Sequence, residues 1–138
     1  MVILLASDVC RYIIKQQPKG LLQSLQGWSA QGDELMLSAI TYAELIAGAL
    51  LTENREKHIK LVQEFCERLD DIVSWDSGAV NCYTDIQMQA MAAGAVLNMN
   101  DAMLAAHAIS LNAELLTLAK SSFAGMGSLE LRIWEQTR

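Results

Sequence analysis

The sequence predicts an α/β domain of three layers, an α/β/α sandwich with a mainly parallel central sheet. Short apolar runs that suit buried strands alternate with longer stretches whose apolar residues recur at helical spacing. Apolar residues make up 52% of the chain and charged residues 19%, so a sizeable core is expected and disorder is not. The 138 residues carry no internal repeat, linker or low-complexity segment. We therefore expect residues 1–138 to form a single domain.

The first strand is expected at Val2–Leu5, an apolar run typical of a parallel strand that is buried on both faces. Ser7 and Asp8 follow, and both are residue types that cap helices. A helix is then expected over Val9–Gln17, because Pro18 stops it. The next expected elements are a helix over Gly20–Ala30, followed by Gly32, and a strand over Glu34–Ala39.

In the middle of the chain, Thr41 is expected to cap a helix over Tyr42–Leu51. Glu44 stands three residues after Thr41, which is the spacing of a capping box. The following expected elements are an amphipathic helix over Glu53–Asp71, a strand over Ile72–Trp75, and a helix that begins at Asp76 or Ser77 and ends near Ala93.

The last third of the chain repeats the alternation of strand and helix. The expected elements are a helix over Ala102–Leu111 that Asn98–Asp101 opens, a strand over Glu114–Leu118, a loop over Lys120–Gly127 and a strand over Leu129–Ile133. This order predicts a parallel sheet with helices on both faces. Ligands of such sheets bind beyond the carboxyl ends of the strands, so the residues that follow each strand are the informative ones.

The bulk properties exclude several classes of protein. A net charge of −6 argues against a general nucleic-acid binder, although a nuclease that holds metal ions on carboxylates is compatible with it. The three cysteines are far apart with no CxxC pair, which favours free thiols over a zinc site. No apolar stretch approaches the roughly 20 residues of a membrane span, and no basic segment precedes the first apolar run. We therefore expect no signal peptide and a cytoplasmic location.

Three acids follow expected strands or open expected helices: Asp8, Glu44 and Asp101. Carboxylates that face one another in a cleft are unfavourable without a cation, and oxygen ligands suit Mg²⁺ or Mn²⁺. A metal held there could activate water and stabilise negative charge on a phosphodiester. The structural alternative is that Asp8 and Asp101 cap helices and that Glu44 completes a capping box. His107 is expected to be a packed or hydrogen-bonded helix residue.

Four segments of the chain form a recognisable series. They are Ile-Leu-Leu-Ala-Ser-Asp-Val at the start, Leu-Ser-Ala-Ile-Thr-Tyr-Ala-Glu-Leu-Ile-Ala-Gly from Leu37, Asn-Asp-Ala-Met-Leu-Ala-Ala-His-Ala from Asn100, and Leu-Leu-Thr from Leu115 with Phe123 and Trp134. In this order they resemble the PIN domain of VapC-type toxins from type II toxin–antitoxin pairs. The resemblance covers nearly the whole chain, and its two middle motifs are the more specific ones.

The resemblance implies a role for particular positions. Glu44 and Asp101 match metal-binding acids of the family, and Asp8, which stands where the family usually has Asn, would tune or orient them. The family's first acid falls at position 6, where this chain has Ala6, and a more variable fourth position falls at Ala119. The metal site therefore keeps Asp101 and Glu44, with a vacant ligand position at Ala6.

The activity that the resemblance implies is that of a Mg²⁺-dependent endoribonuclease toxin, with Mn²⁺ as a substitute ion. The expected substrate is a structured RNA such as tRNA, whose phosphates we expect Lys15, Lys19 and Lys120 to contact, together with the Arg55–Lys60 face. The expected partners are a second copy of the chain in a homodimer and an antitoxin that blocks the site, often with an inserted Arg.

Two explanations of Ala6 stay open. The chain is either a natural member of the family that only binds proteins, or one in which Ala replaces an Asp because an active ribonuclease harms the host that expresses it. The residues around position 6 are otherwise intact, which favours the second explanation. The alternative function is therefore that of a catalytically dead PIN-like protein-binding module.

Overall fold

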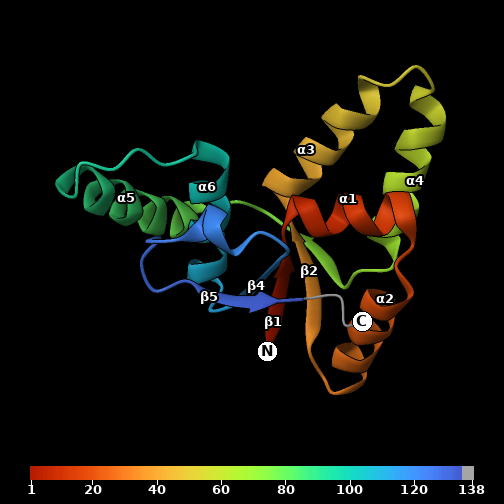
Figure 1. Ribbon diagram of the computed structural model, residues 1–138, viewed down its shortest axis with the longest axis horizontal. Coiled ribbons are helices and arrows are strands. Elements are labelled where there is room, and N and C mark those ends of the chain that lie inside the picture. Colours follow the sequence, from red (N-terminus) through yellow and green to blue (C-terminus); the bar gives the residue numbers. More distant parts are fainter. Residues whose placement is uncertain (135–138) are drawn as a thin grey trace.

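The computed structural model describes residues 1–134 and contains one parallel sheet with helices on both faces (Figure 1). The strand order is β3-β2-β1-β4-β5, and every neighbouring pair is parallel. The predicted α/β architecture with a parallel central sheet is confirmed. The strands are β1 (Val2–Leu5), β2 (Glu34–Ser38), β3 (Asp71–Val73), β4 (Glu114–Thr117) and β5 (Glu130–Ile133).

Six α-helices and one 3₁₀ turn connect the strands in the described residues. They are α1 (Ser7–Gln16), α2 (Lys19–Ala30), α3 (Ala39–Leu50), α4 (Arg55–Glu67), α5 (Ser77–Ala92), α6 (Met99–Ser110) and η1 (Lys120–Phe123). Helices α3 and α4 form an arm on one side of the molecule and α5 projects on the other (Figure 1). None of the described helices has the length and apolarity that crossing a membrane would require.

The alternation of side chains along β1 divides the interior into two cores. Ile3 and Leu5 point into a cluster that α1, α2, α3 and α4 complete. Leu4 points the other way, into a cluster with Ala6 and the small buried residues of α6. All three strand residues are fully buried, which agrees with the prediction of a strand covered on both faces.

The start of α3 differs from the sequence prediction. The helix begins at Ala39, and Ser38 is its N-cap, because the Ser38 hydroxyl accepts a hydrogen bond from the Ile40 N–H at 3.1 Å. Thr41 lies inside the helix and is fully buried, so the predicted Thr41 cap and the capping-box role of Glu44 are wrong. Ser38 ends the strand, and its side chain therefore caps the helix three residues earlier than Thr41 could.

Other helix ends follow the sequence more closely. Asp76 caps α5 by accepting from the Ala79 N–H at 3.1 Å, as predicted. Gly94 after α5 and Asn112 after α6 both have positive φ, at 67° and 53°, a conformation that Gly and Asn adopt readily at the ends of helices. The N-cap of α1 is Ala6, which offers no capping side chain, so Asp8 is not a cap.

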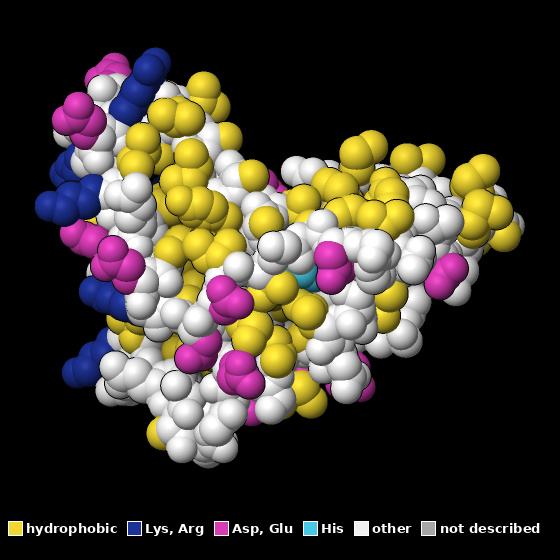
Figure 2. All heavy atoms as spheres, turned by 180° about the vertical axis from the view of Figure 1, so that it is seen from behind, with side chains coloured by type: hydrophobic (Ala, Val, Ile, Leu, Met, Phe, Trp, Pro, Cys, Tyr) yellow, Lys and Arg dark blue, Asp and Glu magenta, His cyan; other side chains and the backbone are white. Residues whose placement is uncertain are grey.

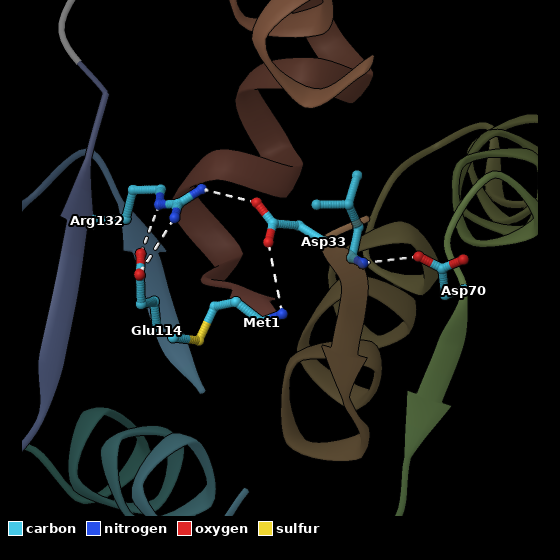
Figure 3. Close-up of polar contacts among 6 residues, drawn as sticks. Met1, Asp33, Asp70, Glu114 and Arg132 are labelled. Carbon is cyan, nitrogen blue, oxygen red and sulfur yellow. Dashed lines mark hydrogen bonds and ion pairs between the residues drawn. The ribbon is translucent and has the colours of Figure 1, made fainter. Parts of the chain in front are cut away.

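Arg132 of β5 links the amino ends of three strands (Figure 3). Its guanidinium binds both carboxylate oxygens of Glu114 on β4 and lies 3.5 Å from the carboxylate of Asp33, just before β2. Asp33 also lies 3.6 Å from the amino group of Met1, which precedes β1. This cluster ties the edge strand β5 to the centre of the sheet, at the end opposite the predicted acids.

Candidate functional site

Asp8 lies in the first turn of α1, beside the carboxyl end of β4. One of its carboxylate oxygens accepts hydrogen bonds from the Thr117 hydroxyl at 3.0 Å and the Leu118 N–H at 2.9 Å. The other oxygen accepts from the Val9 N–H at 2.8 Å. Asp8 therefore joins α1 to the chain that leaves β4, and its carboxylate is held in one orientation.

Asp101 lies in the first turn of α6 and faces Asp8. The N-cap of α6 is Asn98, whose side chain accepts from the Asp101 N–H at 3.0 Å, so Asp101 is not a cap. Burial raises the pKa of the Asp101 carboxyl, and the negative charge of Asp8 raises it further. The fold thus brings together two acids that are far apart in the sequence, at the predicted edge of the sheet.

Ala6 occupies the position between β1 and α1 and is only 3% exposed. Its methyl group belongs to the core cluster on the α5–α6 side, together with Ala102 and Ala105 of α6. A carboxylate at position 6 would therefore point toward the helix that carries Asp101. In the present chain, this part of the site offers only a methyl group.

Glu44 lies on α3, half-buried, at the wall of a groove of about 400 Å³ between α1, α3 and α4. The same groove is lined by Arg11 and Lys15 of α1 and by Lys57 of α4. Lys15 is thus the predicted substrate-binding residue that shares a cavity with a predicted catalytic acid. Lys19 begins α2 and Lys120 begins η1, and neither lines this groove.

The charge distribution over one face follows the helices. Figure 2 shows Lys and Arg side chains along the edge formed by α4 and its neighbours, while acidic side chains gather near the middle of the face. Figure 2 also shows apolar side chains between them, over the α3 arm and over α5. Acidic side chains also lie among the basic ones along that edge, so the charge there is mixed (Figure 2).

The residues present do not fit a resident Mg²⁺ ion. Within residues 1–134, no three His, Cys, Asp or Glu side chains lie together as a metal-binding group. Asp8 and Asp101 supply two neighbouring carboxylates, but Glu44 is not grouped with them and Ala6 has no donor atom. Mg²⁺ demands a near-octahedral set of oxygens. The metal roles of Glu44 and Asp101 therefore stay predictions for a chain with an acid at position 6.

Sequence reasoning missed two polar contacts near this site. Thr117 donates to Asp8 across most of the chain length, and Ser38 on β2 is 2.8 Å from His107 on α6. In both contacts one partner is a hydroxyl residue that ends a buried strand, Ser38 in β2 and Thr117 in β4. This position is the local sequence feature that could have indicated the contacts. The partner across the sheet could not be read from spacing, because it depends on the strand order.

Comparison with known proteins agrees with this arrangement. Residues 10–124 match the PIN domain family. The chain is 29% identical over 134 residues to "Ribonuclease VapC1" of Haemophilus influenzae, covering 97% of this chain and 98% of the relative. It is 24% identical over 131 residues to the "tRNA(fMet)-specific endonuclease VapC" of Shigella flexneri, covering 95% and 96%.

A solved structure shares the whole fold. The structure of VapBC2 from Rickettsia felis, bound to a DNA fragment from their promoter, contains a chain that superposes with a TM-score of 0.91 at 26% identity. The match covers 98% of this chain and 100% of that one. Since the family match extends over most of the sequence and carries the helices that hold Glu44 and Asp101, this chain belongs to the PIN-domain family, and its relatives are of the VapC type.

Proposed function

We propose that this chain is the toxin of a toxin–antitoxin pair, an endoribonuclease whose cleavage activity depends on an acid at position 6 and is lost with Ala6. The observation that carries the proposal is the pairing of Asp101 with Asp8 beside the Ala6 methyl group, at the carboxyl ends of the strands. Similarity to ribonucleases of the VapC type supports the same activity.

The proposed metal is Mg²⁺, with Mn²⁺ able to replace it. In a chain with an acid at position 6, that acid would join Asp101 and Glu44 as oxygen ligands. The hydrogen bonds from Thr117 and Leu118 would keep Asp8 turned toward this group, where its charge strengthens cation binding. The chain with Ala6 does not offer this set, because a methyl group has no donor atom.

The proposed substrate is a structured RNA, and tRNA is the class that the name of the Shigella relative suggests. Arg11, Lys15 and Lys57 share a groove with Glu44 and would hold the phosphate backbone on the way to the acids. We propose weaker phosphate contacts for Lys19 and Lys120, which stand at the starts of α2 and η1.

The proposed partner is a cognate antitoxin that blocks the site, by analogy with the complex named for the Rickettsia structure. An Arg from that partner would suit the two neighbouring carboxylates, since a guanidinium forms charge-assisted hydrogen bonds with them. We also propose a homodimer in the cytoplasm. The apolar side chains that α5 and the chain after it expose, Val80, Met88, Met91, Val96 and Met99, favour an interface there.

The test is the Ala6→Asp protein, expressed from a tightly repressed promoter and assayed for growth arrest and for RNA cleavage with and without Mg²⁺. We expect toxicity and Mg²⁺-dependent cleavage, both absent from the chain with Ala6. Ala6→Asn is the matched control, because it has the same size without the charge. Asp101→Asn in the Ala6→Asp protein should abolish cleavage again.

The second candidate function is a catalytically dead module that binds a basic protein segment. The donor set favours it, because the described residues do not form a metal group. If Ala6→Asp is folded, harmless and unable to cleave RNA, the ribonuclease proposal fails and the module is the better account. Binding of a basic peptide at equal strength with Ala6 and with Ala6→Asp would then be expected.

A further inference from the structure

His107 lies where three segments of the chain meet. It belongs to α6 and is 1% exposed. Its Nδ1 atom is 2.8 Å from the Ser38 hydroxyl, at the junction of β2 and α3. Burial lowers the pKa of the ring, while the Asp76 carboxylate and the Ser74 carbonyl raise it, so the junction of β3 and α5 also faces the imidazole. A buried neutral imidazole with a buried partner is a polar contact between helices, in a layer that is otherwise apolar.

The Ser38 hydroxyl makes a second contact besides the one to His107. Its oxygen accepts the Ile40 N–H at 3.1 Å, and the same hydroxyl lies 2.8 Å from His107 Nδ1, where the tautomer of the imidazole decides which group donates. The other ring nitrogen, Nε2, has no hydrogen-bond partner in the described part of the chain. Ser38 therefore joins the first turn of α3 to α6 with either tautomer.

A second contact fixes the same helix. The Trp75 indole N–H donates to the Met103 carbonyl at 3.0 Å, and Met103 precedes His107 by one turn of α6. Trp75 lies just after β3, as Ser38 lies at the end of β2. The junction after β2 and the junction after β3 thus each form one side-chain hydrogen bond with α6, and the two bonds lie on neighbouring turns of that helix.

The two helices that this contact joins also carry two of the predicted acids. Asp101 is less than two turns before His107 on α6, and Glu44 is less than two turns after Ser38 on α3. The two helices also pack directly against each other. Because a helix moves as a rigid unit over such lengths, a displacement of α6 at the Ser38–His107 contact would carry Asp101 with it.

We propose that His107 is a positioning residue, whose hydrogen bond to Ser38 sets the separation of α6 from α3 and thereby of Asp101 from Glu44. The inference rests on the proposed function for the roles of the two acids. It does not rest on that function for the placement of the helices, which can be measured separately.

The first experiment measures placement in the chain with Ala6. Crystal structures of His107→Leu and Ser38→Ala should show α6 displaced from α3 by more than about 0.5 Å, a tolerance typical of functional sites. His107→Asn, whose side-chain oxygen can stand where Nδ1 stands, should restore the separation. Leu104→Ala is the matched control, because it removes buried volume from α6 and leaves the hydrogen bond intact.

The second experiment measures the consequence in the Ala6→Asp protein. Free Mn²⁺ is followed by electron paramagnetic resonance, and kcat and KM are measured on RNA. We expect His107→Leu and Ser38→Ala to weaken Mn²⁺ binding by about tenfold or more and to lower kcat with little change in KM. His107→Asn should recover both, and Leu104→Ala should lower only the thermal midpoint.

The outcomes separate this inference from the proposed function. Unchanged helix placement in both His107→Leu and Ser38→Ala overturns the positioning role, as does an equal loss of Mn²⁺ affinity in Leu104→Ala. If Ala6→Asp with intact His107 neither binds Mn²⁺ nor cleaves RNA, the proposed function fails, and helix placement alone decides the role of His107. If His107→Leu does not fold, Ser38→Ala and His107→Asn supply the comparison.

Discussion

Asp101 is a side chain whose charge is poorly matched to its surroundings. Its pKa is raised by burial first and by the charge of Asp8 second. A carboxyl whose pKa is raised in the folded state stabilises the fold when protonated, and this contribution is lost as the pH rises through the raised pKa. At neutral pH the repulsion between the Asp8 and Asp101 charges therefore opposes folding. A bound cation or guanidinium would reduce this repulsion.

The prediction at this residue concerns stability without any ligand. Asp101→Asn should raise the thermal midpoint of the metal-free chain at pH 7, and the gain should shrink toward pH 3, where the raised pKa leaves the Asp101 carboxyl neutral. Scanning calorimetry across that range in EDTA measures both. Asp85→Asn, an exposed acid on α5, is the control and should change little. A lower midpoint for Asp101→Asn at pH 7 would contradict the repulsion.

The Asp8 carboxylate, unlike that of Asp101, accepts hydrogen bonds from Val9, Thr117 and Leu118. Asp8→Ala would leave the Thr117 hydroxyl and the Leu118 N–H without their acceptor. We expect a loss of about 1–3 kcal/mol in the free energy of unfolding, measured by urea titration. Thr117→Val in both backgrounds forms a double-mutant cycle, and additivity of the two losses would show that the contact contributes no coupling.

At the scale of elements, β5 is an edge strand whose attachment depends on side chains. The Arg132 guanidinium sits between Glu114 and Asp33 (Figure 3). It also lies 4.8 Å from the centre of the Trp28 ring. All three charged side chains are at most 24% exposed. Removing the cation would leave two partly buried carboxylates without compensation, which is more costly than losing a surface pair.

We therefore expect Arg132→Met to lower the free energy of unfolding by roughly 1–3 kcal/mol and to speed hydrogen exchange in β5. Arg132→Lys should lose part of this, since lysine cannot bind Glu114 through two parallel hydrogen bonds. Hydrogen exchange followed by mass spectrometry measures the effect strand by strand. Equal protection of the β5 amide hydrogens from exchange in Arg132→Met and in the parent chain would contradict this expectation.

The elements also show what sequence reasoning can and cannot reach. Apolar runs and helical spacing located the five strands and the six α-helices of the described residues, because burial leaves a strong local pattern. The helix expected over Glu53–Asp71 ends at Glu67, and β3 begins at Asp71. The loop expected over Lys120–Gly127 begins with the short helix η1. The start of α3 was placed three residues too late, since the capping of Ile40 by Ser38 competes with a capping box that looks equally good in sequence. The Asp8–Thr117 contact joins residues that only the strand order makes neighbours, so no local pattern could reveal it.

At the scale of the whole molecule, the site lies where the two helical layers meet over the ends of the strands. Helix α1 belongs to one layer and α6 to the other, and the acids that they carry, Asp8 and Asp101, are close enough for the charge of Asp8 to raise the pKa of Asp101. The buried contact between Ser38 and His107 joins α6 to α3 close to this place. A buried polar contact lies in a medium of low dielectric constant, so adding a proton and its charge to the imidazole there costs free energy.

The burial of His107 should make the whole molecule less stable in mild acid. Burial lowers its pKa below the usual value of 6.5, although Asp76 and the Ser74 carbonyl act in the opposite direction. Between the lowered pKa and 6.5 the unfolded chain binds the proton and the folded chain does not, so stability falls as the pH drops through that window, by up to about 1.4 kcal/mol per pH unit.

Urea titrations at pH 7.5, 6.5 and 5.5 should show this fall in the parent chain and a flatter dependence in His107→Leu. Asp101 titrates in the opposite sense, but both proteins carry it, so its effect cancels in the comparison. A parallel decline in the two proteins would mean that His107 is protonated as readily in the fold as outside it.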